Sequence, residues 1–233
     1  MKLYDECFEG ISRILENRPV KKLGVSSPPQ WKSTDKNQII FKDDTAFELG
    51  GGNLPALSSV AFTDSRAYVP EDEILLLGND LNETEGDSPF ARIALIRVNE
   101  SKMGTGEKLY QTIRKIEFAR YHINPEGYMT RISAFTHREA ARISKTALGK
   151  GLSFSHVGSF FIEEYKKQPQ VEAVKLLFVT ERDFPYEELE SVMKKSESIT
   201  TALDHIMKDI KMDCQTCSLK AVCDEVEAMC EKI

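Results

Sequence analysis

Cysteine is scarce over most of this chain of 233 residues, because four of its five cysteines lie in the last twenty residues. Only Cys7 precedes them, which excludes the evenly spread disulfide framework of a small secreted domain. Long apolar runs are also missing. The longest, such as residues 93–96, have the length of a strand rather than the roughly 18–20 residues of a membrane span. With no apolar signal region at the amino terminus, we expect a cytoplasmic protein that does not associate with a membrane.

The short motifs of common catalytic sites are absent as well. The four histidines are scattered and form no H-E-x-x-H pair, and no G-x-S-x-G motif marks a serine nucleophile. Residues 50–52 are three consecutive glycines, but no Lys-Ser/Thr pair follows them and the G-x-G-x-x-G spacing is missing. We interpret them as a turn between strands. The sequence by itself therefore identifies no catalytic residue.

The formal net charge of −6 argues against nucleic-acid binding, but the charges are unevenly distributed. Residues 71–87 contain seven acidic side chains and no lysine or arginine. Residues 106–150 contain nine lysines and arginines against four acids. This basic segment is open to two interpretations: a set of solvated faces, or a surface for an anionic small molecule or an acidic partner.

The apolar periodicity predicts helices and strands that alternate without a regular βαβ order. The expected strands are 45–49, 56–62, 73–77, 91–98, 128–135 and 173–180, and the expected helices are 3–15, 107–121, 137–148, 154–165 and 185–210. We predict an α+β (mixed α/β) fold with a central mixed sheet, flanking helices and a small cysteine-rich module. The predicted division is an N-terminal helix and irregular arm (1–40), an α+β domain (41–208) and a cysteine-rich tail (209–233).

The cysteines of the tail follow the spacing C-x2-C-x5-C-x6-C and are Cys214, Cys217, Cys223 and Cys230. Two thiolates at C-x2-C spacing can bind one metal ion or one edge of a cluster. Two further cysteines complete the four-thiolate shell of a zinc ion or a [4Fe-4S] cluster, and the spacing does not choose between them. A second interpretation is that Cys223 and Cys230 share one face of a helix and pack as small apolar residues.

Several segments, in order, resemble the middle domain of the acetyl-CoA synthase subunit, the beta subunit of the carbon monoxide dehydrogenase/acetyl-CoA synthase complex of anaerobes. The resemblance covers residues 45–215, and its motifs are residues 46–49, 78–83, 142–145, 147, 150–151 and 156–158. Cys214 and Cys217 stand where the family begins its nickel–iron–sulfur cluster. Cys223, with the valine before it, resembles the third cluster cysteine of the family.

The resemblance implies further binding residues and also a loss of function. The family has an arginine-rich surface linked to coenzyme A, and the candidates in the basic segment are Arg114, Arg120, Arg138 and Arg142. Guanidinium groups suit this role because they bind phosphate through two hydrogen bonds. The Cys-Gly-Cys tripeptide that holds the distal nickel is absent from this sequence. We therefore expect no distal nickel and no autonomous synthesis of acetyl-CoA.

The sequence predicts an acetyl-CoA-synthase-related iron–sulfur protein of anaerobic one-carbon metabolism. Its [4Fe-4S] cluster would serve electron transfer or partner docking, and its partners would be carbon monoxide dehydrogenase/acetyl-CoA synthase or corrinoid protein subunits. Two alternatives remain. One is a subunit that takes part in acetyl or methyl transfer through a coenzyme A-binding surface. The other is a zinc-stapled interaction module in which the tail is purely structural.

Overall fold

The computed structural model describes residues 1–26, 31–32, 38–132, 138–207 and 217–231. The helices are α1 (Asp5–Leu15), α2 (Glu100–Met103), α3 (Gly106–Phe118), α4 (Lys145–Gly149), α5 (Phe154–Lys166), α6 (Tyr186–Met207) and α7 (Lys220–Glu231), with 3-10 turns η1 (Lys2–Tyr4), η2 (Lys42–Asp44), η3 (Leu81–Glu83) and η4 (Ala119–His122). The strands are β1 (Lys21–Leu23), β2 (Thr45–Leu49), β3 (Ala56–Thr63), β4 (Glu73–Leu77), β5 (Phe90–Val98), β6 (Tyr128–Ile132), β7 (Glu139–Ser144) and β8 (Val171–Val179). The predicted α+β class is confirmed.

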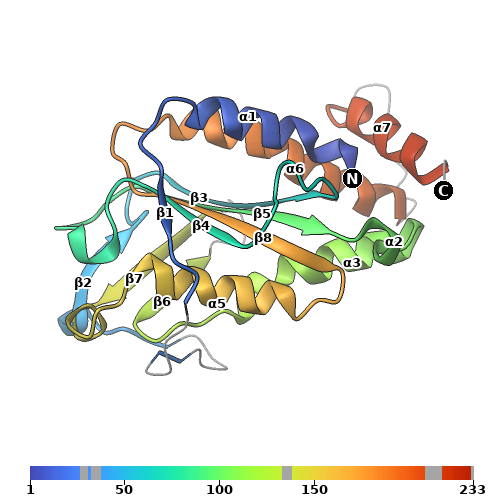
Figure 1. The fold of residues 1–233 in the computed structure, drawn as a ribbon. Coiled ribbons are helices and arrows are strands. Elements are labelled where there is room, and N and C mark those ends of the chain that lie inside the picture. Colours follow the sequence, from blue (N-terminus) through green and yellow to red (C-terminus); the bar gives the residue numbers. More distant parts are fainter. Residues whose placement is uncertain (27–30, 33–37, 133–137, 208–216, 232–233) are drawn as a thin grey trace.

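The strands form two sheets. The larger one has the order β1-β4-β8-β5-β3, and the smaller one has the order β2-β7-β6. In the larger sheet β3 pairs with β5 and β4 with β8 in parallel, whereas β5 and β8 are antiparallel. Figure 1 shows this sheet between two layers of helices, with α1 and α6 on one side and α5 on the other. Because helices cover both faces, strand β5 is buried along its whole length.

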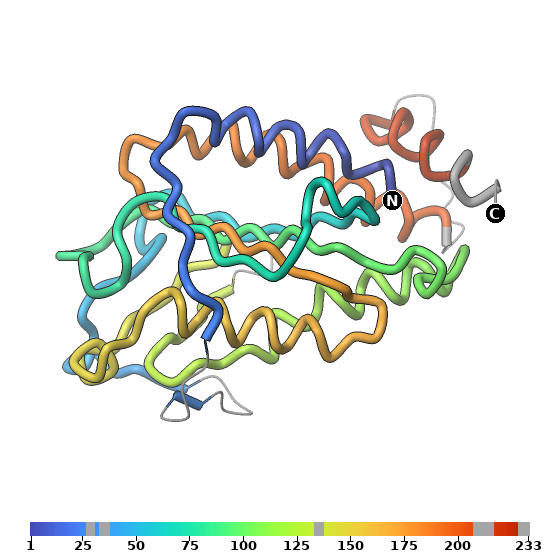
Figure 2. Tube along the Cα trace, in the orientation of Figure 1, coloured from blue at the N-terminus to red at the C-terminus, as the bar shows by residue number. Residues whose placement is uncertain are grey.

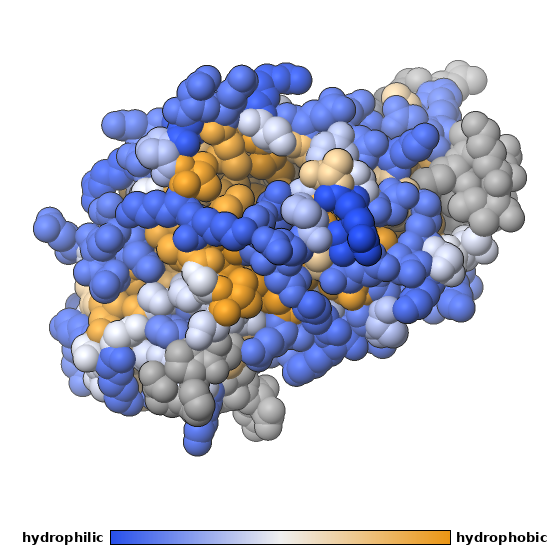
Figure 3. All heavy atoms as spheres, in the orientation of Figure 1, coloured by the Kyte–Doolittle hydropathy of each residue, from blue (hydrophilic) through white to orange (hydrophobic). Residues whose placement is uncertain are grey.

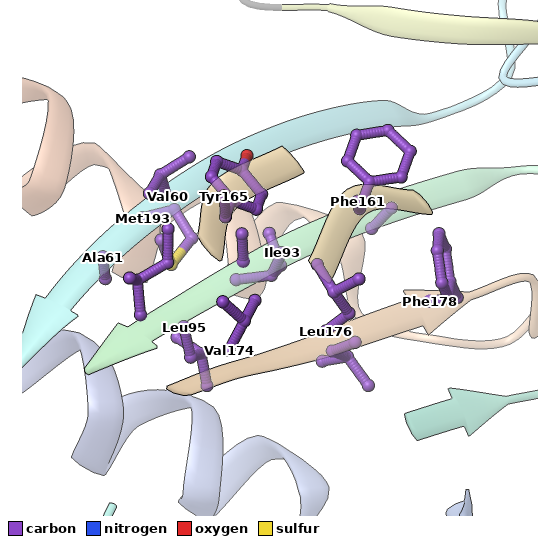
Figure 4. Packing of buried hydrophobic residues seen from close by; sticks show 14 of the residues in the cluster. Val60, Ala61, Ile93, Leu95, Phe161, Tyr165, Val174, Leu176, Phe178 and Met193 are labelled. Carbon is purple, nitrogen blue, oxygen red and sulfur yellow. The ribbon is translucent and has the colours of Figure 1, made fainter. Parts of the chain in front are cut away.

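The core of the protein lies on both faces of the strands β3, β5 and β8. Figure 4 shows Phe161 and Tyr165 of α5 and Met193 of α6 packed against these strands. A stack of aromatic rings extends this core, since the ring centroids of Phe154 and Phe178 lie 4.5 Å apart. Aromatic pairs at this separation add about 0.5–1.5 kcal/mol beyond the area that they bury. The β-branched and aromatic composition of these strands is therefore explained by burial on both faces.

The prediction of one helix over residues 137–148 is wrong for most of that segment. Residues 139–144 form strand β7, and helix begins only at Lys145. Strand β7 pairs with β2 and β6 on its two edges, and Ile143 stands opposite both Phe47 and Tyr128. The alanines of this segment favour a helix, but pairing on both edges and burial of alternate residues override that local preference. Residue 137 lies outside the described residues, as do residues 133–135 of the predicted strand.

The amino-terminal and carboxyl-terminal helices both pack on α6. Val226 of α7 is fully buried, and Lys195 of α6 binds Glu225 of α7 with an Nζ–Oε2 distance of 2.9 Å. The same Nζ lies 3.9 Å from a carboxylate oxygen of Glu6 in α1. Figure 2 shows the amino terminus beside α7. The predicted boundary at residue 209 lies outside the described residues, and the division into domains stays a prediction.

The face seen in Figure 3 is hydrophilic over most of its area, with hydrophobic residues visible near its middle. Strand β1 crosses this face, and Lys22 binds Glu71 and Glu73 with Nζ–Oε1 distances of 3.0 and 2.8 Å. Beneath α1 the ring of Phe8 stacks on Tyr68 with centroids 5.0 Å apart. Among the described residues, no helix has both the length and the apolar character required to cross a bilayer.

Candidate functional site

A buried ion pair joins the two sheets. Arg92 of β5 donates from Nε and Nη2 to the two carboxylate oxygens of Glu139 at the start of β7, over 2.8 and 2.6 Å. Nη2 also donates to the hydroxyl of Ser58 over 2.7 Å, and the guanidinium lies 4.1 Å from the centroid of the Phe161 ring. Burial raises the pKa of Glu139, but the charge and hydrogen bonds of Arg92, the charge of Arg120 and a hydrogen bond from Ser58 together hold this pKa below its usual value. Both side chains therefore remain charged inside the protein.

Arg114 and Arg120 line a small cavity of about 90 Å³ between β3, α3 and α6. Glu117, also in this cavity, accepts hydrogen bonds from Arg114 Nη1 over 3.0 Å and from Thr200 Oγ1 over 2.8 Å. Burial raises the pKa of Glu117, and the neighbouring arginines offset only part of that rise. Arg120 donates from Nη2 to the hydroxyl of Tyr121 over 3.1 Å. The cavity therefore combines two guanidinium groups with a carboxylate whose charge is disfavoured.

Arg138 lies beside the glycine loop instead. Its Nη2 donates to the backbone carbonyls of Gly50, Gly52 and Leu54 over 3.1, 2.6 and 2.5 Å. Gly50 and Gly52 have φ values of +64° and +57°, a region that glycine enters without strain. The interpretation of residues 50–52 as a turn after a strand is confirmed. This turn, together with Arg131 and Arg138, lines a cavity of about 310 Å³.

Glu48 of β2 holds two arginines beside that cavity. Its Oε1 accepts from Arg142 Nε over 2.9 Å and from Nη2 over 2.7 Å, and its Oε2 accepts from Arg131 Nη1 over 2.9 Å. Arg142 also donates from Nη1 to the carbonyl of Ile40 over 3.0 Å. The guanidinium of Arg142 thus donates to Glu48 and Ile40 within the protein, whereas the Arg131 side chain is 50% exposed. Sequence reasoning did not single out Arg131, because only the pairing of β6 with β7 brings it near Glu48.

The four arginines proposed from the sequence are therefore divided between two places. Arg114 and Arg120 line the cavity beside α6, and Arg138 and Arg142 lie near the glycine turn and Glu48. Neither the cavity beside α6 nor the cavity at the glycine turn contains all four of them. Binding of coenzyme A by any of them stays a prediction.

The structure describes the cysteine tail in part. Cys217 and Cys223 are half-buried and form no disulfide, and Cys223 packs against the hydrophobic core from within α7. Cys214 and the side chain of Cys230 lie outside what is described. Among the described residues, no three histidine, cysteine or acidic side chains are grouped as a metal site. The four-cysteine ligand set stays a prediction.

The fold defines an α+β protein with two arginine-lined cavities and a cysteine-bearing helix at its carboxyl end. Residues 32–184 match the sequence model of the CO dehydrogenase/acetyl-CoA synthase complex beta subunit. The match covers more than half of the chain, which therefore belongs to this family, as the motifs in the sequence predict. It includes the Arg92–Glu139 ion pair and all four candidate arginines, but ends before the cysteines of the tail. No curated protein matches the sequence.

Proposed function

We propose that this member of the family is an accessory iron–sulfur protein of the CO dehydrogenase/acetyl-CoA synthase complex. Cys214, Cys217, Cys223 and Cys230 would hold a [4Fe-4S] cluster, which supplies one-electron transfer or a docking point for a partner subunit. The four-thiolate donor set fits such a cluster in kind and number. The observation that supports the proposal is the helical conformation of α7, because that helix includes two of the four proposed ligands, Cys223 and Cys230.

The length of α7 between these two ligands favours a cluster over a zinc ion. Residues 223 and 230 are seven positions apart in one helix, so their α-carbons are separated by about 10.5 Å. Two sulfurs on one tetrahedral zinc lie about 3.8 Å apart, and their α-carbons can then be separated by about 9.4 Å at most. A four-iron cluster binds each thiolate through a different iron and spans a wider shell. This separation supports a cluster over a single zinc ion as the group that the tail would hold.

Metal and acid-labile sulfide analysis of anaerobically purified protein tests this proposal. We expect about four iron and four sulfide per chain, with loss of the cluster in Cys214→Ser, Cys217→Ser and Cys223→Ser. Cys7→Ser is the matched control, because Cys7 is buried under α6 and its thiol donates to the carbonyl of Val192. Zinc without iron would support the alternative in which a structural zinc ion holds the tail. Protein without any metal would refute both the cluster and the zinc site. A cluster retained in Cys230→Ser would mean that this residue is not a ligand.

The cavity beside the glycine turn supports the second candidate function, binding of coenzyme A in acetyl or methyl transfer. Its volume of about 310 Å³ is at the lower end of the roughly 300–1,000 Å³ of small-molecule sites, and it is lined by Arg131 and Arg138. Such a site would hold the phosphate end of the ligand through guanidinium groups. Arg142 would act indirectly, because its donors bind Glu48 and Ile40.

Calorimetric titration with coenzyme A tests this second function. Arg131→Gln removes an exposed partner of Glu48 and is expected to cost less than about 1 kcal/mol of stability, so a loss of binding would report on the ligand. Arg66→Gln is the control, because Arg66 is exposed and lies away from the cavity lining. Absence of binding to the wild-type protein at millimolar coenzyme A would refute this function and leave the iron–sulfur proposal untouched.

A further inference from the structure

Two apolar side chains close together in the sequence are exposed to solvent, and neither proposed function uses them. Ile39 is 73% exposed and Phe41 is 70% exposed, whereas Ile40 between them is 4% exposed. The backbone of Phe41 is extended, with φ −73° and ψ 161°. Side chains two positions apart in an extended segment point to the same side. Ile39 and Phe41 therefore form one apolar pair at the surface, and they are the two most exposed large hydrophobic residues among those described.

Ile40 holds this segment on the outer face of the small sheet β2-β7-β6. Its backbone N–H donates to Met129 Sδ in β6 over 3.3 Å, and its carbonyl accepts from Arg142 Nη1 in β7 over 3.0 Å. Met129 and Arg142 stand opposite each other in the two strands, and both are half-buried. The neighbouring pair, Tyr128 and Ile143, is buried on the inner face. The apolar pair thus lies on the solvent side of a sheet whose other face is packed on the core.

The charged residues beside the apolar pair carry both signs in equal number. Lys42 and Asp43 follow the pair directly and are exposed, and Lys145 donates from Nζ to the carbonyl of Asp43 over 3.2 Å. A hydrogen bond from the hydroxyl of Ser144, together with two from α4, holds the pKa of Asp44 below its usual value and keeps it charged. A partner of one charge sign would gain little from two lysines and two aspartates. A second copy of this chain presents both signs in return.

The cysteine-bearing helix of the same chain does not cover the apolar pair. Figure 1 shows α7 at one end of the molecule and β2 at the other, and the pair directly precedes η2 and β2 in the sequence. A contact with the same surface of a second copy would remove Ile39 and Phe41 of both copies from water. Single exposed apolar residues are common on soluble proteins, but four that meet in one contact supply a driving force for association.

We propose that the surface around Ile39 and Phe41 is the contact between two copies of this chain related by a two-fold axis. The apolar pairs pack on each other, and Lys42 of one copy faces Asp43 of the other, because a two-fold contact uses the same surface on both sides. The surface is small, and interfaces below about 1,200 Å² are typical of weak, reversible association. This inference goes beyond both proposed functions and depends on neither the cysteines nor coenzyme A.

Sedimentation equilibrium of the full-length protein tests the proposal. We expect a monomer–dimer equilibrium between about 5 and 500 μM, the range in which weak association is measurable. Ile39→Ser and Phe41→Ser should each raise the dissociation constant of the dimer about 10-fold or more, because the apolar area that the dimer buries is lost. Phe118→Ser is the matched control, because Phe118 is 46% exposed at the end of α3 and should leave the constant unchanged. A wild-type protein that stays monomeric, or equal effects of Phe41→Ser and Phe118→Ser, would overturn the proposal.

Charge variants test the two-fold arrangement without removing the apolar pair. Lys42→Glu should weaken the dimer roughly 3-fold, because two exposed ion pairs are replaced by repulsion between acids. Lys42→Glu/Asp43→Lys should restore it, since each copy again supplies both signs, and a failure to restore it would contradict the arrangement. Cys214→Ser should dimerise like the wild-type protein, and a dimer lost together with iron would move the contact to the tail and overturn the proposal. Iron analysis of the same samples reports separately on the cluster.

Discussion

The indole ring of Trp31 packs against the imidazole ring of His156, with ring centroids 5.2 Å apart. Trp31 is the only tryptophan of the chain and is buried. His156 belongs to the first turn of α5, and its Nδ1 lies 3.0 Å from the hydroxyl of Ser153. This contact fixes the segment around residue 31 to α5 and gives the protein an internal fluorescent reporter.

Trp31 fluorescence should respond to pH through His156. Burial lowers the pKa of His156 below its usual value near 6.5, and the charge of Asp80 offsets only part of this effect. We expect constant emission between about pH 8 and 6.5 and quenching below that range, where a charged imidazolium forms beside the indole. As the pH falls below about 6.5, His156 of the unfolded chain is protonated before His156 of the folded chain. The free energy of unfolding should therefore also decrease below about pH 6.5. His156→Gln should abolish the quenching step and His122→Gln should preserve it; the opposite pattern would contradict the assignment.

Glu139→Gln should be strongly destabilising, because it leaves the Arg92 guanidinium buried without its counter-charge. Removal of one partner of a buried pair costs about 3–5 kcal/mol, measured here as the loss in free energy of unfolding in urea. Glu126→Gln is the control, because Glu126 pairs with Lys150 at the surface and its loss should cost at most about 1 kcal/mol. Similar losses in the two variants would show that the buried pair has no special role. The double variant Arg92→Met/Glu139→Leu should recover part of the loss.

The same ion pair should make the protein sensitive to acid. Because the pKa of Glu139 is lower in the folded than in the unfolded state, this residue contributes stability above about pH 4.3. That contribution is lost as the pH falls through the folded-state pKa. Urea unfolding at a series of pH values should therefore show a smaller acid-dependent slope in Glu139→Gln than in the wild-type protein. An unchanged slope would assign the acid sensitivity to other carboxylates.

Cys7 should be chemically inert in the folded protein. Burial raises the pKa of its thiol to about 11, and its side chain is fully buried, whereas Cys217 is partly exposed. The thiolate is the reactive form, so Ellman's reagent at pH 8 should label Cys217 in metal-free protein and reach Cys7 only after unfolding. Mass spectrometry of the labelled peptides distinguishes the two sites. Rapid labelling of Cys7 without denaturant would contradict the packing of α1 on α6.

Gly127→Ala should cost more stability than Gly52→Ala. Both glycines have positive φ, +80° and +57°, but an added Cβ at residue 127 would come within 2.1 Å of the Ala147 side chain. At residue 52 it would meet nothing within 4 Å. Alanine in the left-handed backbone region costs roughly 1–2 kcal/mol, and this cost is common to both variants. The difference between their free energies of unfolding therefore measures the clash with Ala147 in the turn before β6. Equal costs would mean that α4 moves aside.

Sequence reasoning was sufficient where local pattern decides the outcome. The apolar spacing predicted strands close to β2, β3, β4 and β5, and the helices close to α3 and α5, because burial of one face imposes a period on the chain. The glycines of residues 50–52 were correctly interpreted as a turn, since Gly50 and Gly52 adopt the positive φ that a residue without a side chain reaches easily. The order of several short motifs was enough to identify the family.

Tertiary structure decided what depends on partners distant in the chain. Residues 139–144 form strand β7 because β2 and β6 pair with its two edges. The alanines of this segment favour a helix, so its composition could not predict the pairing. The Arg92–Glu139 pair joins residues 47 positions apart, and no local signal marks either residue. The separation of the four arginines into two places likewise depends on the packing of α6 against β3 and of β7 against β2. The sequence by itself determined the family, the fold class and the cysteine spacing, because these are properties of local order along the chain. The charged groups that meet inside the protein were decided only by the packing of its helices and sheets.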